Sequence, residues 1–263
     1  MRAVPGVRPA RRVRFDLAYD GTDFAGWQLQ PNRRTVQGIL EQVLTRIQGE
    51  GQVRVRGAGR TDAGVHARAQ VADCELATRL DDGALIHALR GMLPQDLRPV
   101  RLVSVSPQFD SRRDARSKTY RYRLDLSAHA SPFLARFALH HPDPIDIGAV
   151  ETALASLPGE RDWSAFTASS CRIENRVRRL TEATYEASGQ EGWFCFSGNG
   201  FLTHMARNLV GTLLEVAGGR IPPSRLAAIL ESGDRRLAGQ TAPARGLILW
   251  EVRYPSIESA AAV

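Results

Sequence analysis

The sequence predicts an α+β protein, built from two ferredoxin-like halves that share an extended antiparallel β-sheet with flanking helices. In the first half, period-two and helical hydrophobic patterns follow one another in the order strand, helix, strand, strand, helix, strand. The second half repeats this order less clearly. The chain has 263 residues, of which 43% are hydrophobic and 24% charged, so it can bury a substantial core as one large domain or as two closely joined halves.

The first half comprises residues 12–106 and follows a basic tail, residues 1–11, that we expect to be disordered. Asp20-Gly21 is a turn signal, and Thr35 is a suitable N-cap for a helix. The expected elements are a strand at Val13–Tyr19, a helix carrying Val36 to Ile47, strands at Gln52–Arg56 and Ala69–Ala77, a helix at Asp82–Met92 and a strand at Val100–Val105.

The second half comprises residues 107–255 and precedes a short tail, residues 256–263, that we expect to be frayed. Its two central strands are joined at Gly189-Gln190-Glu191, which is typical of a hairpin turn. The expected elements are a strand at Thr119–Leu126, a helix at Ile147–Leu157, strands at Leu180–Ser188 and Gly192–Ser197, helices at Phe201–Ala217 and Ser224–Glu231, and a strand at Gly246–Tyr254.

The charge of the chain favours a polyanionic partner such as nucleic acid, because the net charge is +7 and the pI is near 10.0. Lys118 is the only lysine, and the other basic residues are arginines. Arginine suits phosphate forks and base stacking better than lysine does. A genome-wide preference for arginine codons explains the same bias equally well.

Cofactors and membranes are not indicated. Cys74, Cys171 and Cys195 are odd in number and far apart, so neither a disulfide framework nor a zinc site is expected. The histidines form no H-x-x-x-H pair. The chain has no apolar run of about 18 residues and no signal peptide. We therefore expect a cytoplasmic, reducing location.

The stretch most typical of an active site is Arg56–Ala67, RGAGRTDAGVHA. Its three glycines permit backbone shapes that other residues avoid, and Asp62 lies among them with Arg60 two residues before it. Nearby guanidinium groups stabilise an ionised carboxylate, which can act as a nucleophile. A glycine-rich turn capped by an aspartate is the simpler interpretation. A phosphate-binding P-loop does not fit, because no lysine follows the glycines.

Two other stretches carry candidate functional residues. In Phe109–Leu124, five arginines and one lysine alternate with two tyrosines, which suits a nucleic-acid surface as well as a solvated strand face. In Gly198–Gly211, Arg207 lies at the edge of a strongly apolar helix face. A buried cation there needs a partner, whereas an arginine that reaches the surface does not.

These stretches resemble one known family. GAGRTDAGVHA closely resembles the catalytic motif of the tRNA pseudouridine synthase A (TruA) family, and YDGTDFAGWQLQ at Tyr19–Gln30 is similar to its opening signature. The resemblance spans about Arg12 to Tyr254 and implies the pseudouridine synthase fold. It also implies three catalytic residues: Asp62 as the nucleophile, Tyr120 as the residue that stacks on the uracil, and Arg207 as the partner of Asp62. Tyr122 is expected to be a packing residue.

The resemblance also implies RNA contacts. Arg60 is expected to hold the target nucleotide out of the RNA stack. This sequence departs from the family's F-H-A-R-F form, since it has Asp110, Ser111 and Arg113 where the family has His, Ala and Phe. The expected RNA-binding residues are Arg60, Arg79, Phe109, Asp110, Ser111, Arg112, Arg113, Ser170, Cys171 and Arg172.

The implied activity is isomerisation of uridine to pseudouridine at positions 38, 39 and 40 in the anticodon stem-loop of tRNAs. The implied mechanism is attack by Asp62 on a flipped-out uridine, without a metal or cofactor. The implied partners are tRNA and a second copy of the chain in a homodimer. Two alternatives stay open: a catalytically silent tRNA-binding protein, and a hydrolase of small nucleosides, which would need a second carboxylate.

Overall fold

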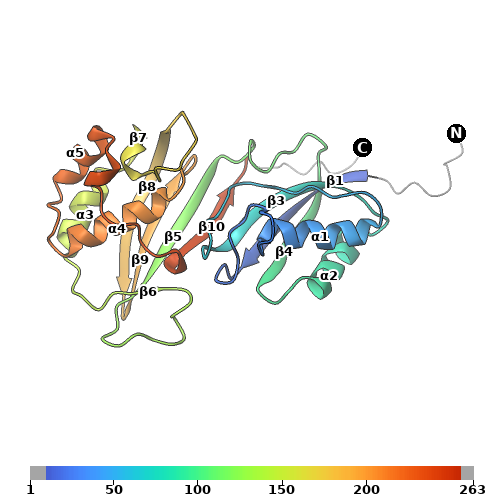
Figure 1. The fold of residues 1–263 in the computed structure, drawn as a ribbon, viewed down its shortest axis with the longest axis horizontal. Coiled ribbons are helices and arrows are strands. Elements are labelled where there is room, and N and C mark those ends of the chain that lie inside the picture. The colour runs from blue at the N-terminus through green and yellow to red at the C-terminus, as the bar shows by residue number, and fades with distance from the viewer. Residues whose placement is uncertain (1–9, 256–263) are drawn as a thin grey trace, which may run out of the picture. The chain divides into compact units, whose positions relative to one another are not determined.

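A computed structural model describes residues 10–255, so most of the two predicted tails lies outside the described residues. The chain forms two compact units (Figure 1). The first contains described residues 10–115 and 254–255, and the second contains 116–253. Each unit combines helices with a largely antiparallel sheet, which confirms the α+β class.

The sheet of the first unit has β1 in its middle. β1 (Ala10–Tyr19) pairs antiparallel with β3 (His66–Ala77) on one side and with β4 (Leu97–Val105) on the other. β2 (Arg56–Gly57) adds a short pairing to β3. Alternate residues of β1 are buried, namely Val13, Phe15, Leu17 and Tyr19, as period-two patterning predicts.

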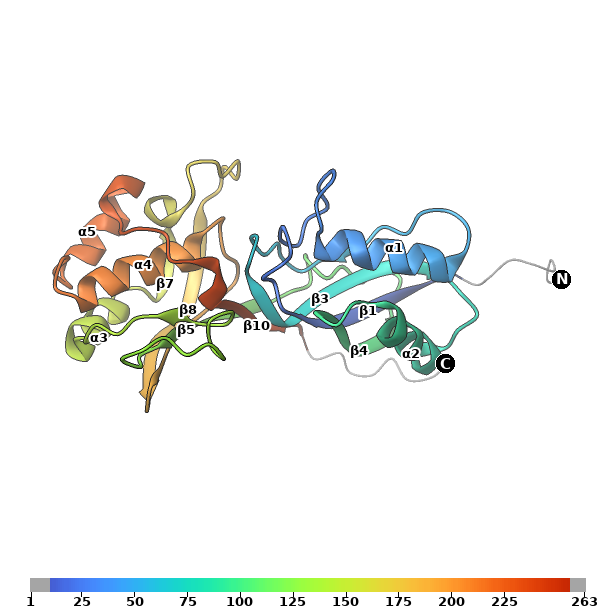
Figure 2. The same cartoon turned by 60° about the horizontal axis from the view of Figure 1, so that its bottom comes forward.

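Two helices cover the sheet of the first unit. α1 (Val36–Gln48) contacts β3, α2 (Asp82–Met92) packs against β4, and the two helices contact each other. Figure 2 shows α1 running alongside β1 and β3. The Thr35 side chain accepts a hydrogen bond from the Gly38 N–H, which confirms the predicted N-cap. Both helices place leucines in the core: Leu40, Leu44, Leu85 and Leu89.

The second unit has a sheet in the strand order β10–β5–β9–β8–β7, with all these pairings antiparallel, and β6 pairs parallel with β5. Helix α3 contacts α4 and β8, and α4 and α5 contact the 3₁₀ turn η1; Figure 1 shows the three helices gathered together. The elements are β5 (Ser117–Asp125), β6 (Leu139–His140), α3 (Ile147–Ala155), β7 (Gly159–Asp162), η1 (Ser164–Phe166), β8 (Val177–Ser188), β9 (Glu191–Gly198), α4 (Met205–Ala217), α5 (Arg225–Ser232), η2 (Arg235–Leu237), η3 (Ala244–Gly246) and β10 (Leu247–Arg253).

The predicted strand at Gln52–Arg56 is mostly wrong, because only its last residue belongs to β2. Side chains of α1 take the backbone N–H groups that a neighbouring strand would otherwise bind. Val53 N–H donates to the Thr45 hydroxyl at 3.1 Å, and Val55 N–H donates to the Glu41 carboxylate at 2.9 Å. The alternation of apolar residues is therefore real, but this segment packs on a helix.

Two further differences concern the second unit. The helix predicted from Phe201 begins only at Met205, because His204 has a left-handed backbone with φ of 63°. β7 was not predicted, since its sequence Gly-Glu-Arg-Asp has no apolar alternation.

Candidate active site

Asp62 lies in a loop of the first unit, residues 58–65, which joins β2 to β3 and is called here the Asp62 loop. On one side, β3 fixes this loop. The Ala58 N–H donates to the Val71 carbonyl at 2.8 Å, and the side-chain amide of Gln70 donates to the Gly59 carbonyl at 2.9 Å. The residues before Asp62 therefore share the rigidity of a sheet strand.

On the other side, the segment Tyr19–Gln30 binds the loop backbone. The Trp27 N–H donates to the Thr61 carbonyl at 3.0 Å, and the Gly64 N–H donates to the Phe24 carbonyl at 3.3 Å. The two stretches that carry the family resemblance are therefore in direct contact. Asp62 itself is half-buried between these fixed points, and its carbonyl accepts the Val65 N–H at 3.1 Å.

Two glycines permit this close packing. Gly26 has φ of +90°, and a Cβ there would lie 2.7 Å from the Thr61 carbonyl oxygen. A Cβ on Gly57 would lie 2.5 Å from the Trp27 ring. Neither site has room for a side chain, and Gly26 also has a backbone conformation that L-residues rarely adopt.

Tyr120 lies in the middle of β5 in the second unit and is 7% exposed. Its ring meets Phe201 edge-on at 4.9 Å. Tyr122, two residues further along the same strand, is fully buried, and its hydroxyl donates to the Pro243 carbonyl at 2.8 Å. Burial raises the pKa of Tyr122, and the positive charge of Arg207 partly offsets this effect. Tyr122 is therefore a packing residue, as predicted, and its phenol stays protonated.

Arg207 is on α4 of the second unit and is half-buried. Its Nε donates to the Ala242 carbonyl at 2.8 Å, and the Ala242 N–H donates back to the Arg207 carbonyl at 3.1 Å. Because Pro243 accepts from Tyr122, residues 242–243 join α4 to β5. The guanidinium of Arg207 is thereby oriented relative to the strand that carries Tyr120.

A buried polar network fixes the segment that binds Arg207. Asn208 is fully buried, and its amide donates to the Phe166 carbonyl at 2.7 Å. The Asn208 side-chain oxygen accepts from Arg235 at 3.1 Å and from the Thr241 hydroxyl at 2.6 Å. Asn208, the residue after Arg207, thus attaches the chain around residue 241 to α4.

Residues 109–113 include both buried and exposed members of the predicted RNA-binding set. Phe109, Asp110 and Ser111 are buried, whereas Arg112 is exposed and the side chain of Arg113 is 79% exposed. Burial alone would raise the pKa of Asp110, but the backbone N–H groups of Arg113 and Arg112 and the charge of Arg56 outweigh it and lower this pKa.

Asp110 and Ser111 take part in an internal ion-pair network of the first unit. Asp73 has 0% exposure, and its carboxylate binds Arg12 at 3.1 Å, Arg56 at 3.0 Å and the Ser111 N–H at 2.9 Å. Arg56 also binds Asp110 at 2.7 Å. This network attaches residues 107–115, which the sequence predicts to be part of the second half, to the first unit.

The remaining predicted RNA contacts are distributed over both units. Arg60, at the Asp62 loop, and Arg79, after β3, are exposed in the first unit. In the second unit, Ser170 and Arg172 are exposed, whereas Cys171 is buried. Burial alone would raise the pKa of Cys171, but hydrogen bonds from Ile173 and Thr203 and the charge of Arg176 lower it.

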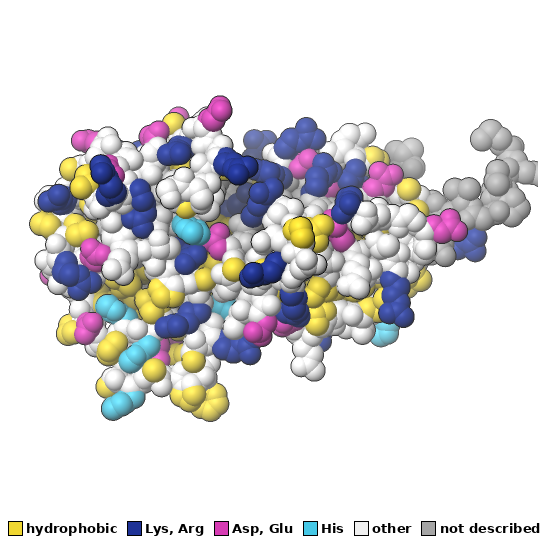
Figure 3. All heavy atoms as spheres, viewed as in Figure 1, with side chains coloured by type: hydrophobic (Ala, Val, Ile, Leu, Met, Phe, Trp, Pro, Cys, Tyr) yellow, Lys and Arg dark blue, Asp and Glu magenta, His cyan; other side chains and the backbone are white. Residues whose placement is uncertain are grey.

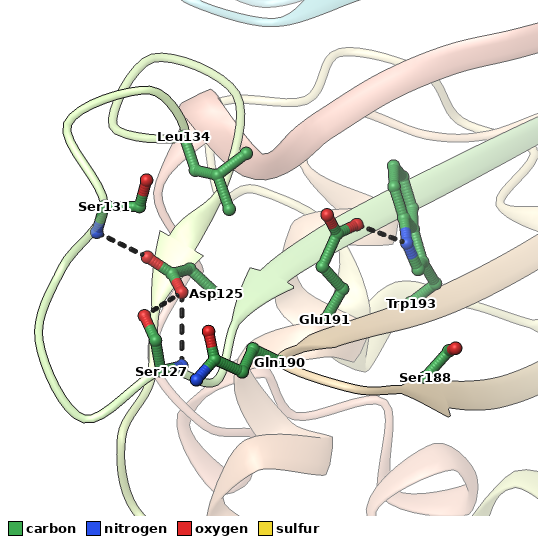
Figure 4. A pocket seen from close by; sticks show the side chains of 8 residues that line it. All are labelled: Asp125, Ser127, Ser131, Leu134, Ser188, Gln190, Glu191 and Trp193. Carbon is green, nitrogen blue, oxygen red and sulfur yellow. Dashed lines mark hydrogen bonds between the residues drawn. The ribbon is translucent and has the colours of Figure 1, made fainter.

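A surface pocket in the second unit contains two carboxylates, Asp125 and Glu191 (Figure 4). Ser127 and the Ser131 N–H bind Asp125, and their hydrogen bonds lower its pKa. Arg123 binds both oxygens of Glu191 and lowers its pKa. A glycosidase acid needs a raised pKa, so this pair does not supply one.

The surface is rich in arginine. Figure 3 shows Lys and Arg side chains on the viewed face of both units. Within residues 10–255, no group of three or more His, Cys, Asp or Glu side chains could hold a metal ion. None of the helices in this described part of the chain has the length and apolarity needed to cross a membrane.

A rigid loop that presents a carboxylate, in an arginine-rich α+β protein, is consistent with the class of RNA-modifying enzymes. Comparison with known proteins identifies the family. The sequence profile of the family described as tRNA pseudouridine synthase matches residues 17–110 and 153–255. "tRNA pseudouridine synthase A" from Streptococcus sanguinis is 42% identical over 245 residues, which cover 92% of this chain and 98% of that protein. The protein of that name from Latilactobacillus sakei is 42% identical over 246 residues, covering 93% and 99%.

The chain belongs to the tRNA pseudouridine synthase family and is an isomerase. Among solved structures, "Crystal Structure of a Cbf5-Nop10-Gar1 Complex" is similar with a TM-score of 0.35 and 11% identity, over 90% of this chain and 58% of that chain.

Proposed function

We propose that this chain converts uridine to pseudouridine at positions 38, 39 and 40 in the anticodon stem-loop of tRNAs, with Asp62 as the nucleophile. The observation that carries the proposal is the Asp62 loop, whose backbone is bonded on one side to β3 and on the other to Tyr19–Gln30. A half-buried carboxylate in a fixed loop can attack a carbon electrophile without first paying the entropy of ordering.

In the proposed reaction, a carboxylate oxygen of Asp62 forms a bond to C1′ of ribose as the bond from N1 of uracil to C1′ breaks. The detached base turns, and its C5 bonds to C1′ as the bond from Asp62 to C1′ breaks and frees the carboxylate. C5 then loses a proton and N1 gains one, so no redox partner is needed. Tyr120 stacks on the flipped uracil and can accept a proton. Arg207 pairs with Asp62, and Arg60 holds the target nucleotide out of the RNA stack.

tRNA binding is proposed to rest on exposed arginines. Arg112 and Arg113 extend from a turn whose shape is fixed by Asp110, which accepts hydrogen bonds from the N–H groups of both arginines at 2.9 and 3.0 Å. The burial of Phe109, Asp110 and Ser111 favours a supporting role for these three side chains. In the second unit, Ser170 and Arg172 are exposed and available for contact, whereas Cys171 is buried.

The test is the change Asp62→Asn, which keeps the size of the side chain and removes its nucleophile. We expect no pseudouridine at positions 38–40 of unmodified tRNA, mapped by chemical labelling. The Kd for tRNA should stay within about tenfold, or about 1.4 kcal/mol, because phosphate contacts dominate affinity. The matched control is Asp146→Asn, since Asp146 caps α3 and asparagine caps a helix equally well.

The same assay separates the alternatives. A silent tRNA-binding protein would make no pseudouridine even as the wild type, and a nucleoside hydrolase would release free uracil. An Asp62→Asn protein that works at the wild-type rate would refute the assignment of the nucleophile.

We also propose, from the family resemblance, that the chain forms a homodimer and works in the cytoplasm. Light scattering of the purified protein at micromolar concentration should give twice the chain mass of 28.9 kDa. A single-chain mass under the conditions of the activity assay would contradict the dimer and leave the proposed reaction intact.

A further inference from the structure

The hydroxyl of Tyr19 contacts the residue immediately before Asp62. Tyr19 Oη lies 2.8 Å from Thr61 Oγ1, and both side chains are buried. The side-chain nitrogen of Gln70 lies 3.5 Å from the same Tyr19 oxygen and 2.9 Å from the Gly59 carbonyl oxygen. Three buried side chains from β1, β3 and the loop therefore meet at the residue that precedes Asp62.

Tyr19 is well suited to fix a loop. It is the last residue of β1, the middle strand of the first unit, and it pairs with Ala67 of β3 and Leu97 of β4. Its ring meets Phe24 at 6.3 Å and Trp27 at 6.5 Å. Its hydroxyl therefore extends from a side chain that sheet pairing and aromatic packing both hold.

The chemistry of the three groups fixes one donor. The Gln70 nitrogen can only donate, so Tyr19 Oη accepts a hydrogen bond from it, and Tyr19 Oη and Thr61 Oγ1 share a second hydrogen bond in which either hydroxyl can donate. Burial raises the pKa of Tyr19 to about 12, so the phenol stays protonated throughout the neutral range. The Thr61 carbonyl is bound separately by the Trp27 N–H, so both ends of this residue are fixed.

Gln70 shows that the arrangement is not optimised for stability. Within the described residues, its side-chain oxygen is buried and has no hydrogen-bond partner, and its exposure is 0%. An unsatisfied buried oxygen destabilises a fold. Turning the amide over would bring this oxygen against the Gly59 carbonyl, which is also an acceptor. The side-chain oxygen of Gln70 thus lowers the stability of the fold, while the side-chain nitrogen binds the Asp62 loop.

We propose that Tyr19, Thr61 and Gln70 are positioning residues that hold the carboxylate of Asp62 in its reactive place through one hydrogen-bonded cluster. This inference rests on the proposed role of Asp62 as the nucleophile. The cluster does not touch the substrate. Its effect should be on the rate of the chemical step, because a displacement of about 1 Å in a reacting group can lower a rate about a hundredfold.

The first test uses Tyr19→Phe, Thr61→Val and Gln70→Leu in single-turnover reactions on unmodified tRNA. We expect each change to lower the rate constant by about ten- to a hundredfold while the Kd for tRNA changes less than about twofold. Thr61→Ser keeps the hydroxyl and should stay within about threefold of the wild-type rate. The double variant Tyr19→Phe/Thr61→Val should be no slower than the slower single variant, because both remove the same contact.

The controls separate positioning from stability. Thr45→Val removes a half-buried hydroxyl of α1 that accepts the Val53 N–H, and it should change neither rate nor affinity. Gln70→Leu removes the unsatisfied oxygen and also the donor to the Gly59 carbonyl, so these two effects offset each other and its unfolding midpoint should change little although its rate falls. Wild-type rates in all three single variants, or rate losses that only follow the unfolding midpoint, would overturn the proposal.

A second readout does not depend on activity. Hydrogen exchange measured by mass spectrometry on peptides covering residues 57–66 should speed up in Tyr19→Phe and Thr61→Val and stay unchanged in Thr45→Val. If the wild type made no pseudouridine, the proposed function would fail while this measurement still reported on the loop. Unchanged exchange in a fully active wild-type background would refute the cluster alone.

Discussion

Single residues decide how closely the two motif stretches of the first unit approach each other. Gly26 and Thr61 are far apart in sequence, yet one methyl group on Gly26 would lie 2.7 Å from the Thr61 carbonyl oxygen. The sequence motif located Asp62, and the structure shows what surrounds its backbone. Gln70 carried no such signal, and the opening signature that begins at Tyr19 did not indicate what this tyrosine contacts, because a strand-ending tyrosine and a strand glutamine are ordinary until their neighbours are known.

The change Gly26→Ala tests this close approach, with Gly189→Ala as its matched control. Both glycines have positive φ, but nothing lies within 4 Å of a Cβ on Gly189. The control should lose about 1–2 kcal/mol of unfolding free energy from backbone strain alone. Gly26→Ala should lose about 1–3 kcal/mol more from overpacking, and turnover should fall as well. Equal losses in urea unfolding would show that the loop simply moves away.

At the scale of elements, α4 depends on the segment that crosses it. The chain at residues 238–242 lies against the helix so closely that a Cβ on Gly211 would be 1.6 Å from the Gln240 carbonyl oxygen. The Gly239 N–H donates to the Thr212 hydroxyl at 2.9 Å. This contact places Ala242 where its carbonyl accepts from Arg207.

We therefore expect Gly211→Ala to destabilise the protein by about 3 kcal/mol or more, because the methyl group collides with backbone. The chain offers a helical control in Gly91 of α2, which has nothing within 4 Å of a Cβ. Gly91→Ala should be neutral or stabilise by up to about 1 kcal/mol, since alanine favours helix. Thermal unfolding measures both. A tolerated Gly211→Ala with full turnover would mean that the crossing segment does not position Arg207.

Element positions were predictable where one pattern controlled them. α2 was predicted at its observed bounds, because Asp81 caps it and its apolar face is regular. The start of α4 was not predictable, since Phe201 and Leu202 continue the apolar pattern and only the left-handed backbone of His204 stops the helix. At Gln52–Val55, the side chains that bind the backbone come from α1, so no local pattern could show this packing.

At the scale of the whole molecule, the net charge of +7 predicts that the affinity for tRNA depends on the salt concentration. Counterion release makes affinity fall steeply with salt. Arg112→Ala should flatten the slope of log Kd against log salt by about one unit if Arg112 contacts a phosphate. Arg236→Ala is the control, because it removes the same charge from an exposed arginine that Asp234 binds at 2.7 Å. Equal slopes in the two variants would show that the change comes from the loss of one positive charge anywhere on the protein, and not from a phosphate contact of Arg112.

The sequence could not show that Asp110 and Ser111 are buried. Their neighbours Asp73 and Arg56 are remote in the chain, and the ion pairs among them depend on strand pairing. The same contacts explain why residues 107–115 pack with the first unit and not with the second.

The packing of Tyr19–Gln30 against the Asp62 loop has a consequence for recombination between relatives. The two stretches pack closely against each other at Gly26 and Gly57, so they have to be exchanged together. A chimera that imports residues 19–30 from a distant relative while keeping its own 57–66 would inherit mismatched surfaces at Gly26 and Gly57. Exchanging both stretches together would keep the match, so crossover points that preserve function should fall outside residues 19–66.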